Sequence, residues 1–217
     1  MITVIWGGLL PIDSNLRTLY VCMYLFRMSR KLFMIMKIHI SGIPVSPVFR
    51  SHPEKHQARQ ELHIPQNKKV YLIMTGGIGC ENMHSLCQGM LEKLDENSLM
   101  IVLVGKNQEL KMKLDARYGG DSRMRTVSFT KQVAEYMAAS DVLLSKPGGL
   151  SSTEAAVANI PLVHIHAIPG CETYNARFFS SHGMSVAAET EAEAIRSAIA
   201  LANDPEAAQR MRQNQRT

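Results

Sequence analysis

From residue 68 onward, short β-rich runs alternate with longer helical runs, and this alternation restricts the fold more than any other feature. The run 98–105 (SLMIVLVG) is made of aliphatic residues, whereas 81–94 places its apolar residues at helical spacing. Runs of 4–8 strand-like residues are separated by helical runs of 9–15 residues. This order is typical of βαβ units, in which helices connect parallel strands. The sequence therefore predicts an α/β fold, a Rossmann-like doubly wound parallel sheet.

The residues at the ends of the expected helices support this division. Gly119 and Gly183 stand where two helices would stop. Thr190 precedes an acidic first turn, and Pro205 stands at the first position of the last helix. We expect strands at residues 68–75, 98–105, 124–129, 141–145, 160–166 and 184–189, and helices at residues 81–94, 107–119, 131–140, 151–159, 171–183, 190–204 and 205–215.

The chain divides into three parts by composition. Residues 1–40 form a cationic, apolar segment, which we interpret as the remnant of a further domain. Residues 41–67 contain four prolines and are predicted to be a linker with a short helix. Residues 68–217 hold all six βα units and should make one complete domain.

The N-terminal segment carries the net charge of the chain. Six Lys or Arg and one acid lie in the first 50 residues, whereas the rest of the chain has 18 residues of each sign. Its uncharged runs are shorter than the roughly 18–20 residues of a spanning helix, and no cleavage site for a secretory signal follows. One interpretation is a membrane-surface segment that lays side chains such as Phe26 and Phe33 into the interface. The other, which we favour, is a core element of a domain whose other half is absent.

Cysteine and histidine give no sign of a disulfide frame or a metal site. The four cysteines form no CxxC pair and are typical of reduced thiols in a cytosolic protein. His164 and His166 alternate onto one face of a strand, but no third ligand is nearby, so structural histidines are the favoured interpretation. We expect no metal, and the neutral main body favours no nucleic-acid partner.

The loop after the first strand is rich in glycine. The stretch 75–82 (TGGIGCEN) contains Gly76, Gly77 and Gly79. Its G-G-x-G pattern differs from the G-x-G-x-x-G of nicotinamide sites. The glycines would let the backbone approach a bulky group while the next helix offers free N–H groups to an anion. A plain tight turn is an equally weighted alternative.

A second loop follows the fourth strand. In the stretch 145–155 (SKPGGLSSTEA), Gly148 and Gly149 bend the chain into a helix whose first turn carries Ser151 and Ser152. Their hydroxyls and amides would form an anion socket at the positive end of the helix. Glu154 could accept two hydrogen bonds from a ribose diol or act as a capping residue.

A third loop, 166–176 (HAIPGCETYNA), presents Glu172 and Asn175 at the start of the next helix. Loops that follow parallel strands lie at one edge of the sheet. Three such loops, each with Gly-Gly or Pro-Gly, therefore favour a nucleotide-sugar or dinucleotide site.

Four motifs in this order resemble one enzyme family. "GIPVSPVF", "VGKNQEL", "SKPGGLSSTEA" and "IPGCETYNARFF" resemble the C-terminal half of the diacylglycerol glycosyltransferases and monogalactosyldiacylglycerol synthases, relatives of the transferase that forms lipid II. The similarity covers roughly residues 38–215. It implies one half of a GT-B architecture, with transfer of glucose or galactose from a UDP-sugar to a lipid hydroxyl. The UDP-sugar would be a substrate, and no cofactor or metal ion is implied.

The resemblance also implies roles for particular residues. The glycine loop (Gly76, Gly77, Gly79), together with Gly148, Gly149, Ser151 and Ser152, would lie at the diphosphate. Glu154 would hold the ribose, and Glu172 and Asn175 would face the sugar. The stretch from Val127 to Phe129 would clasp uracil through backbone groups.

The chain departs from this family at three places. About 40 residues precede the linker where the family has an acceptor domain of about 150 residues, so the catalytic residues are unknown and expected in that missing domain. Cys80-Glu81 replaces small residues, and Lys106 stands where the family has arginine. A non-catalytic nucleotide-sugar-binding module and a UDP-GlcNAc-using relative stay open as alternatives. The family also implies a lipid acceptor and a cytoplasmic, peripheral location at the inner face of the cell membrane. An apolar face left by the missing half would favour self-association or membrane contact.

Overall fold

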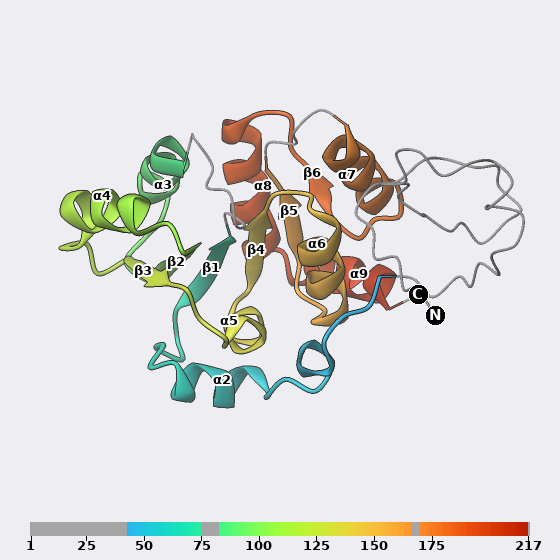
Figure 1. Ribbon diagram of the computed structural model, residues 1–217, viewed down its shortest axis with the longest axis horizontal. Coiled ribbons are helices and arrows are strands. Elements are labelled where there is room, and N and C mark those ends of the chain that lie inside the picture. Colours follow the sequence, from blue (N-terminus) through green and yellow to red (C-terminus); the bar gives the residue numbers. More distant parts are fainter. Residues whose placement is uncertain (1–42, 75–82, 166–169, 217) are drawn as a thin grey trace, which may run out of the picture.

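The computed structural model describes residues 43–74, 83–165 and 170–216. Within them, six parallel strands form one sheet in the order β3-β2-β1-β4-β5-β6, with helices on both sides (Figure 1). This arrangement confirms the predicted doubly wound α/β fold. The strands are β1 (Lys69–Met74), β2 (Ser98–Gly105), β3 (Met124–Ser128), β4 (Val142–Ser145), β5 (Leu162–His164) and β6 (Val186–Ala187). The helices are η1 (Pro47–Phe49), α2 (Lys55–Glu61), α3 (Met83–Leu91), α4 (Gln108–Tyr118), α5 (Val133–Ala139), α6 (Gly149–Val157), α7 (Cys171–Ser181), α8 (Glu191–Asn203) and α9 (Pro205–Gln215).

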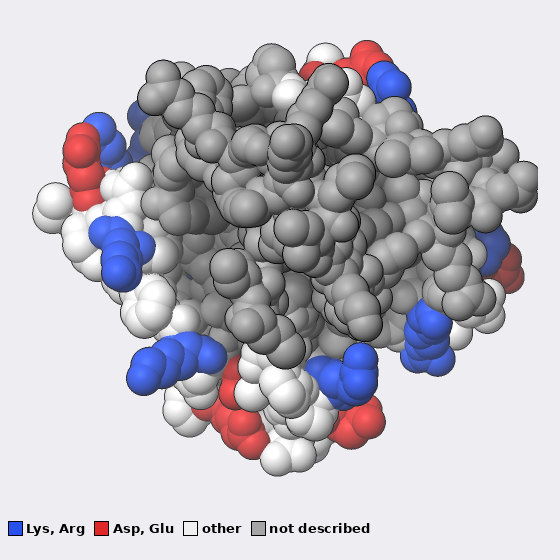
Figure 2. All heavy atoms as spheres, turned by 45° about the vertical axis from the view of Figure 1, so that its right-hand side comes forward, with Lys and Arg blue, Asp and Glu red and all other residues white. Residues whose placement is uncertain are grey.

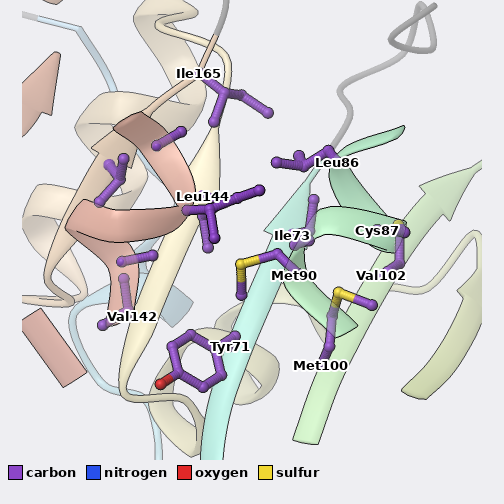
Figure 3. Close-up of a cluster of buried hydrophobic side chains, with 14 of the residues drawn as sticks. Tyr71, Ile73, Leu86, Cys87, Met90, Met100, Val102, Val142, Leu144 and Ile165 are labelled. Carbon is purple, nitrogen blue, oxygen red and sulfur yellow. The ribbon is translucent and has the colours of Figure 1, made fainter. Parts of the chain in front are cut away.

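The sheet is buried on both faces, as its continuous aliphatic strands require. Alternate side chains of β1 enter opposite layers: Tyr71 and Ile73 pack with α3, α4 and α8, whereas Val70 and Leu72 pack with α2, α5 and α6. Figure 3 shows the first layer, where side chains from β1, β2 and β4 meet those of α3. Cys87 lies inside this layer as a free thiol. Burial and, to a smaller extent, Glu191 raise the pKa of Cys87 to about 12, so it stays protonated.

The segment 43–67 packs onto the sheet instead of standing apart from it. Phe49 and Leu62 are buried in the same layer as Leu72. Arg59 is 4% exposed and donates hydrogen bonds to the carbonyls of Ala139 (2.8 Å) and Gln66 (2.8 Å). Its third partner is the carboxylate of Asp141, and the bonds to Ala139 and Asp141 tie α2 to the body of the domain. The expected short helix is therefore present, and the described part of the expected linker contributes to the core.

The helix ends follow the residues that predicted them. Thr190 accepts a hydrogen bond from the amide of Glu193, and Pro205 is the first residue of α9. Gly183 adopts a φ of 65°, which L-residues with a side chain rarely adopt, just beyond the end of α7. β5 begins later than expected, because Pro161 has no N–H to pair, and β6, at the edge of the sheet, is shorter than expected. Among the helices that the structure describes, none is long and apolar enough to cross a membrane.

Candidate functional site

The sheet has one point where its strand order reverses direction, between β1 and β4. From there the chain proceeds outward to β3 on one side and to β6 on the other. In sheets of this kind, ligands bind beyond the carboxyl ends of the two strands that flank this point. The loop after β1, with Gly76, Gly77 and Gly79, lies outside the described residues. The described half of the crevice is thus the connection from β4 to α6.

The first turn of α6 exposes backbone amides at this crevice. Gly148 is the N-cap residue, with an extended backbone (φ −70°, ψ 140°) and no side chain to cap the helix. The amide of Ser152 makes the first bond of the helix, to the carbonyl of Gly148 at 3.0 Å. The amides of Gly149, Leu150 and Ser151 precede that bond and have no acceptor within the helix. This arrangement of donors at a positive helix end suits an anion.

The two serines of this turn have different surroundings. Ser151 is half-buried, and its hydroxyl oxygen lies 3.0 Å from the position that a Cβ on Gly148 would take. Any larger residue at 148 would therefore crowd the first turn. Ser152 is fully buried, and its Oγ lies 2.9 Å from Nε2 of His164. The structure thus brings Ser151 to the crevice and turns the Ser152 hydroxyl into the interior, away from the expected anion socket.

His164 in β5 connects the first turn of α6 to Ser185. Its Nδ1 lies 3.1 Å from the hydroxyl of Ser185, and the ring edge meets Phe179. Burial lowers the pKa of His164 to about 4, so the ring is neutral near pH 7 and one serine donates to it while the other accepts. The described residues contain no cluster of His, Cys, Asp or Glu that could hold a metal, and His166 lies outside them. Sequence reasoning missed this bridge, although a histidine in an apolar strand was its signal.

Glu154 lies in the second turn of α6, on the same helix as the free amides. It is half-buried, and burial raises the pKa of its carboxyl group. Among the described residues, no hydrogen-bond donor or cation contacts this carboxylate within bonding distance. A partly desolvated carboxylate without a partner is costly to keep in a fold, and it is a strong acceptor for ligand hydroxyl groups.

The start of α7 lies at the same carboxyl edge of the sheet, beside the β4–α6 connection. Gly170 precedes the helix with a φ of 111°, a backbone conformation that favours glycine. Asn175 is 2% exposed, and its Nδ2 donates to the carbonyl of Pro147 at 2.9 Å. This bond fixes the β4–α6 connection to α7, so Asn175 positions the loop. Its Oδ1 is buried without a partner among the described residues. Glu172 is half-buried in the first turn.

The expected uracil end of the site lies at β2 and β3. The pairing of these strands shifts between Leu103 and Gly105, where Gly105 has a φ of 59°. Val127 is half-buried near the end of β3, whereas the ring of Phe129 just beyond it is 62% exposed. Lys106 Nζ lies 5.8 Å from the centroid of that ring. An aromatic ring that is left exposed beside a cation at a strand end can stack on a planar base. Sequence reasoning assigned only backbone contacts here.

Charges on the molecule are mixed. In the view of Figure 2, Lys and Arg alternate with Asp and Glu over the described atoms around the grey ones. Several exposed charges are neutralised within one helix, as in the pairs Lys111–Asp115 and Lys113–Glu109. The described charges on this face therefore do not form one broad basic surface.

Comparison with known proteins identifies the family of this domain. A processive diacylglycerol beta-glucosyltransferase from Bacillus pumilus is 30% identical over 182 residues, covering 83% of this chain and 47% of the relative. The chain spans about half the length of such curated relatives. Two solved structures share the fold at 16–20% identity. The C-terminal CMP-Kdo binding domain of WaaA from Acinetobacter baumannii has a TM-score of 0.61, with 79% of this chain and 97% of that chain covered. Anabaena HepE in complex with UDP has a TM-score of 0.59, with 79% and 47% covered. The Glycosyltransferase family 28 C-terminal domain matches residues 70–217. This chain belongs to that family of glycosyltransferase domains.

Proposed function

We propose that this chain supplies the donor-binding half of a glycosyltransferase that moves a hexose from a UDP-sugar to diacylglycerol or a related lipid. One observation carries the proposal. The amides at the start of α6 lie at the reversal point of the sheet, and the carboxylate of Glu154, which has no bonding partner among the described residues, lies one turn along the same helix. Few ligands need both a cradle for phosphate and an acceptor for vicinal hydroxyl groups, and a nucleoside diphosphate is one of them.

The geometry suggests how such a site would assist the reaction. Negative charge grows on the departing UDP as the bond to the sugar breaks. The amides of Gly149, Leu150 and Ser151 would stabilise that charge without reorganising, because the helix already holds them in place. Glu154 would accept hydrogen bonds from the ribose hydroxyls, and Phe129 would stack on uracil. Gly76, Gly77 and Gly79 remain predicted contacts of the diphosphate.

The acceptor side of the proposal draws on the relatives. The curated proteins that match are named for glucosyl transfer to diacylglycerol, and this chain covers about half of their length. The catalytic base and the lipid site are therefore proposed to come from an acceptor domain outside the described residues. A lipid acceptor would require the working enzyme to meet the membrane surface, and we expect peripheral attachment at the cytoplasmic face.

Titration with UDP tests the donor site directly. Calorimetry on the 217-residue chain should give a dissociation constant for UDP in the micromolar to millimolar range (about −8 to −4 kcal/mol). Glu154→Gln should weaken UDP binding by about tenfold, because a neutral amide is a poorer acceptor for two hydroxyl groups. Glu206→Gln is the matched control, since Glu206 is exposed on α9. Equal UDP affinity in wild type and Glu154→Gln would remove the ribose assignment, and no UDP binding in either would remove the donor site.

A further inference from the structure

A second concave site lies at the other edge of the sheet. Its volume is about 650 Å³, which is typical of small-molecule sites. Its walls come from the C-terminal ends of α5, α6 and α9 and from the stretch between η1 and α2. Because the strands are parallel, these ends of α5 and α6 lie beside the amino ends of β4 and β5. The first turn of α6 lies at the opposite edge, where the strands have their carboxyl ends. The proposed donor function does not use this pocket.

Several of the cations that line the pocket have no acidic partner among the residues that the structure describes. Of its basic lining residues, Lys55 is neutralised by Asp141. Arg50, Arg212 and Arg216 make no ion pair with any acid in the described part of the chain. The one acid that lines the pocket is the exposed Glu54. The pocket therefore has an excess of positive charge at close range.

Asn159 holds the side chain of one of these arginines and the backbone of another. Asn159 lies just past the end of α6 with a φ of 57°, and its amide lies between the side chain of Arg216 and the carbonyl of Arg212. In the amide orientation that gives every polar atom a partner, its Oδ1 accepts from Arg216 at 2.7 Å (Nη2) and 3.1 Å (Nε), while its Nδ2 donates to the carbonyl of Arg212 at 2.7 Å. Arg212 is half-buried, and burial is the main cause that lowers the pKa of its guanidinium. The nearby charges of Asp141, which raises this pKa, and of Arg216, which lowers it, act in opposite directions. A partly desolvated cation is stabilised when an anion approaches it.

We propose that this pocket binds the phosphate group of an anionic ligand, with Arg212 and Arg216 as its main contacts and Arg50 at the rim. Guanidinium groups match phosphate oxygens in geometry and stay charged, so an arginine pair is the usual means of binding phosphate esters. Gln215 favours a ligand that carries a hydroxyl group beside its phosphate. Its Nε2 donates to the carbonyls of Ile160 and Met184, and its buried Oε1 has no donor among the described residues. A hydroxyl group on the ligand would satisfy that oxygen.

A structural role for the same arginines makes a different prediction. The C-terminal ends of α5 and α6 carry partial negative charge, and cations there stabilise helices. If Arg212 acts only in this way, its replacement would lower stability and leave phosphate affinity unchanged. Binding measurements therefore separate the two roles.

Inorganic phosphate is the probe for the first test. Calorimetry of the 217-residue chain, at constant ionic strength against chloride, should detect millimolar phosphate binding. Arg212→Gln and Arg216→Gln should each weaken it at least fivefold, whereas Arg210→Gln on the exposed side of α9 should not. Arg212→Lys should recover part of the affinity and guards against loss of folding. No binding by the wild type, or equal affinity in Arg212→Gln, would overturn the proposal. UDP affinity should be unchanged in Arg212→Gln, so failure here stays distinct from failure at the donor site.

Vesicles identify the source of the phosphate group. Sedimentation with phosphatidylglycerol vesicles, compared with phosphatidylcholine vesicles, should show binding that depends on Arg212 if the ligand is a lipid headgroup. If phosphate binds but Arg212→Gln sediments with phosphatidylglycerol like the wild type, the site takes a soluble phosphate ester. Either outcome supports a phosphate site, provided that the calorimetric difference is present.

Discussion

Single side chains decide how firmly the candidate donor site is held. Ser152 and His164 show this, because their 2.9 Å contact joins the first turn of α6 to β5 beneath the crevice. The prediction that both serines line the crevice followed from their adjacency in sequence. Adjacent residues on a helix point about 100° apart, so the two hydroxyl groups have different surroundings. The position of the sheet decides which of them is buried.

The neutral state of His164 gives a pH dependence of stability. The pKa of His164 is about 4 in the folded protein and about 6.5 in the unfolded chain. The unfolded chain therefore takes up the proton first, and the folded state loses stability as pH falls from about 7 to 4, by roughly 3 kcal/mol. Urea unfolding at several pH values should show this loss in wild type and its absence in His164→Gln. His56→Gln, at an exposed position, should keep the wild-type profile. A parallel profile in His164→Gln would contradict the assignment.

At the scale of elements, the sequence predicted where helices end, but it did not predict the contacts between helices, strands and loops. The alternation of apolar runs predicted every described strand, because parallel strands need two buried faces and helices need one. Asn175 shows the limit. Its bond to Pro147 depends on how α7 lies against the β4–α6 connection, 28 residues away, and no local pattern encodes it. The same holds for Asn159 and the two arginines of α9.

Gly183 offers a test of one such helix end. Its φ of 65° follows α7, and a Cβ there would lie 2.4 Å from Nδ2 of Asn214 in α9. Gly183→Ala should lower the free energy of unfolding by about 1–2 kcal/mol, since both the backbone and the neighbouring amide must shift. Gly120→Ala is the control, because nothing lies within 4 Å of a Cβ at that position. Urea unfolding measures both, and a change smaller than that of the control would show that α7 ends in another way.

The whole molecule has its two candidate sites at opposite edges of one sheet. The carboxyl edge carries the amides at the start of α6, and the amino edge carries Arg212 of α9 and Arg216 just after it, which make no ion pair within the described part of the chain. Figure 1 shows α6 and α9 in the fold. Helix α6 reaches both, with Gly148 at its start and Asn159 just past its end. The two sites therefore share a helix whose positive end would meet a diphosphate and whose negative end is covered by cations.

The extent of the folding unit is the last property to test. Phe49, Leu62 and Ile64 are buried against the sheet, and Arg59 with Lys55 holds Asp141. A chain that begins at residue 43 keeps all of these contacts, whereas one that begins at residue 68 exposes the apolar layer and leaves the Asp141 carboxylate without its cations. We expect the free energy of unfolding of 68–217 to be at least about 3 kcal/mol below that of 43–217, or the shorter chain to aggregate. Urea unfolding followed by circular dichroism compares the two. Asp141→Asn in 68–217 should recover part of the loss, because it removes the unpaired charge. Equal stability of the two chains would mean that 43–67 is a linker after all, and that the sheet with the helices after β1 forms the complete domain.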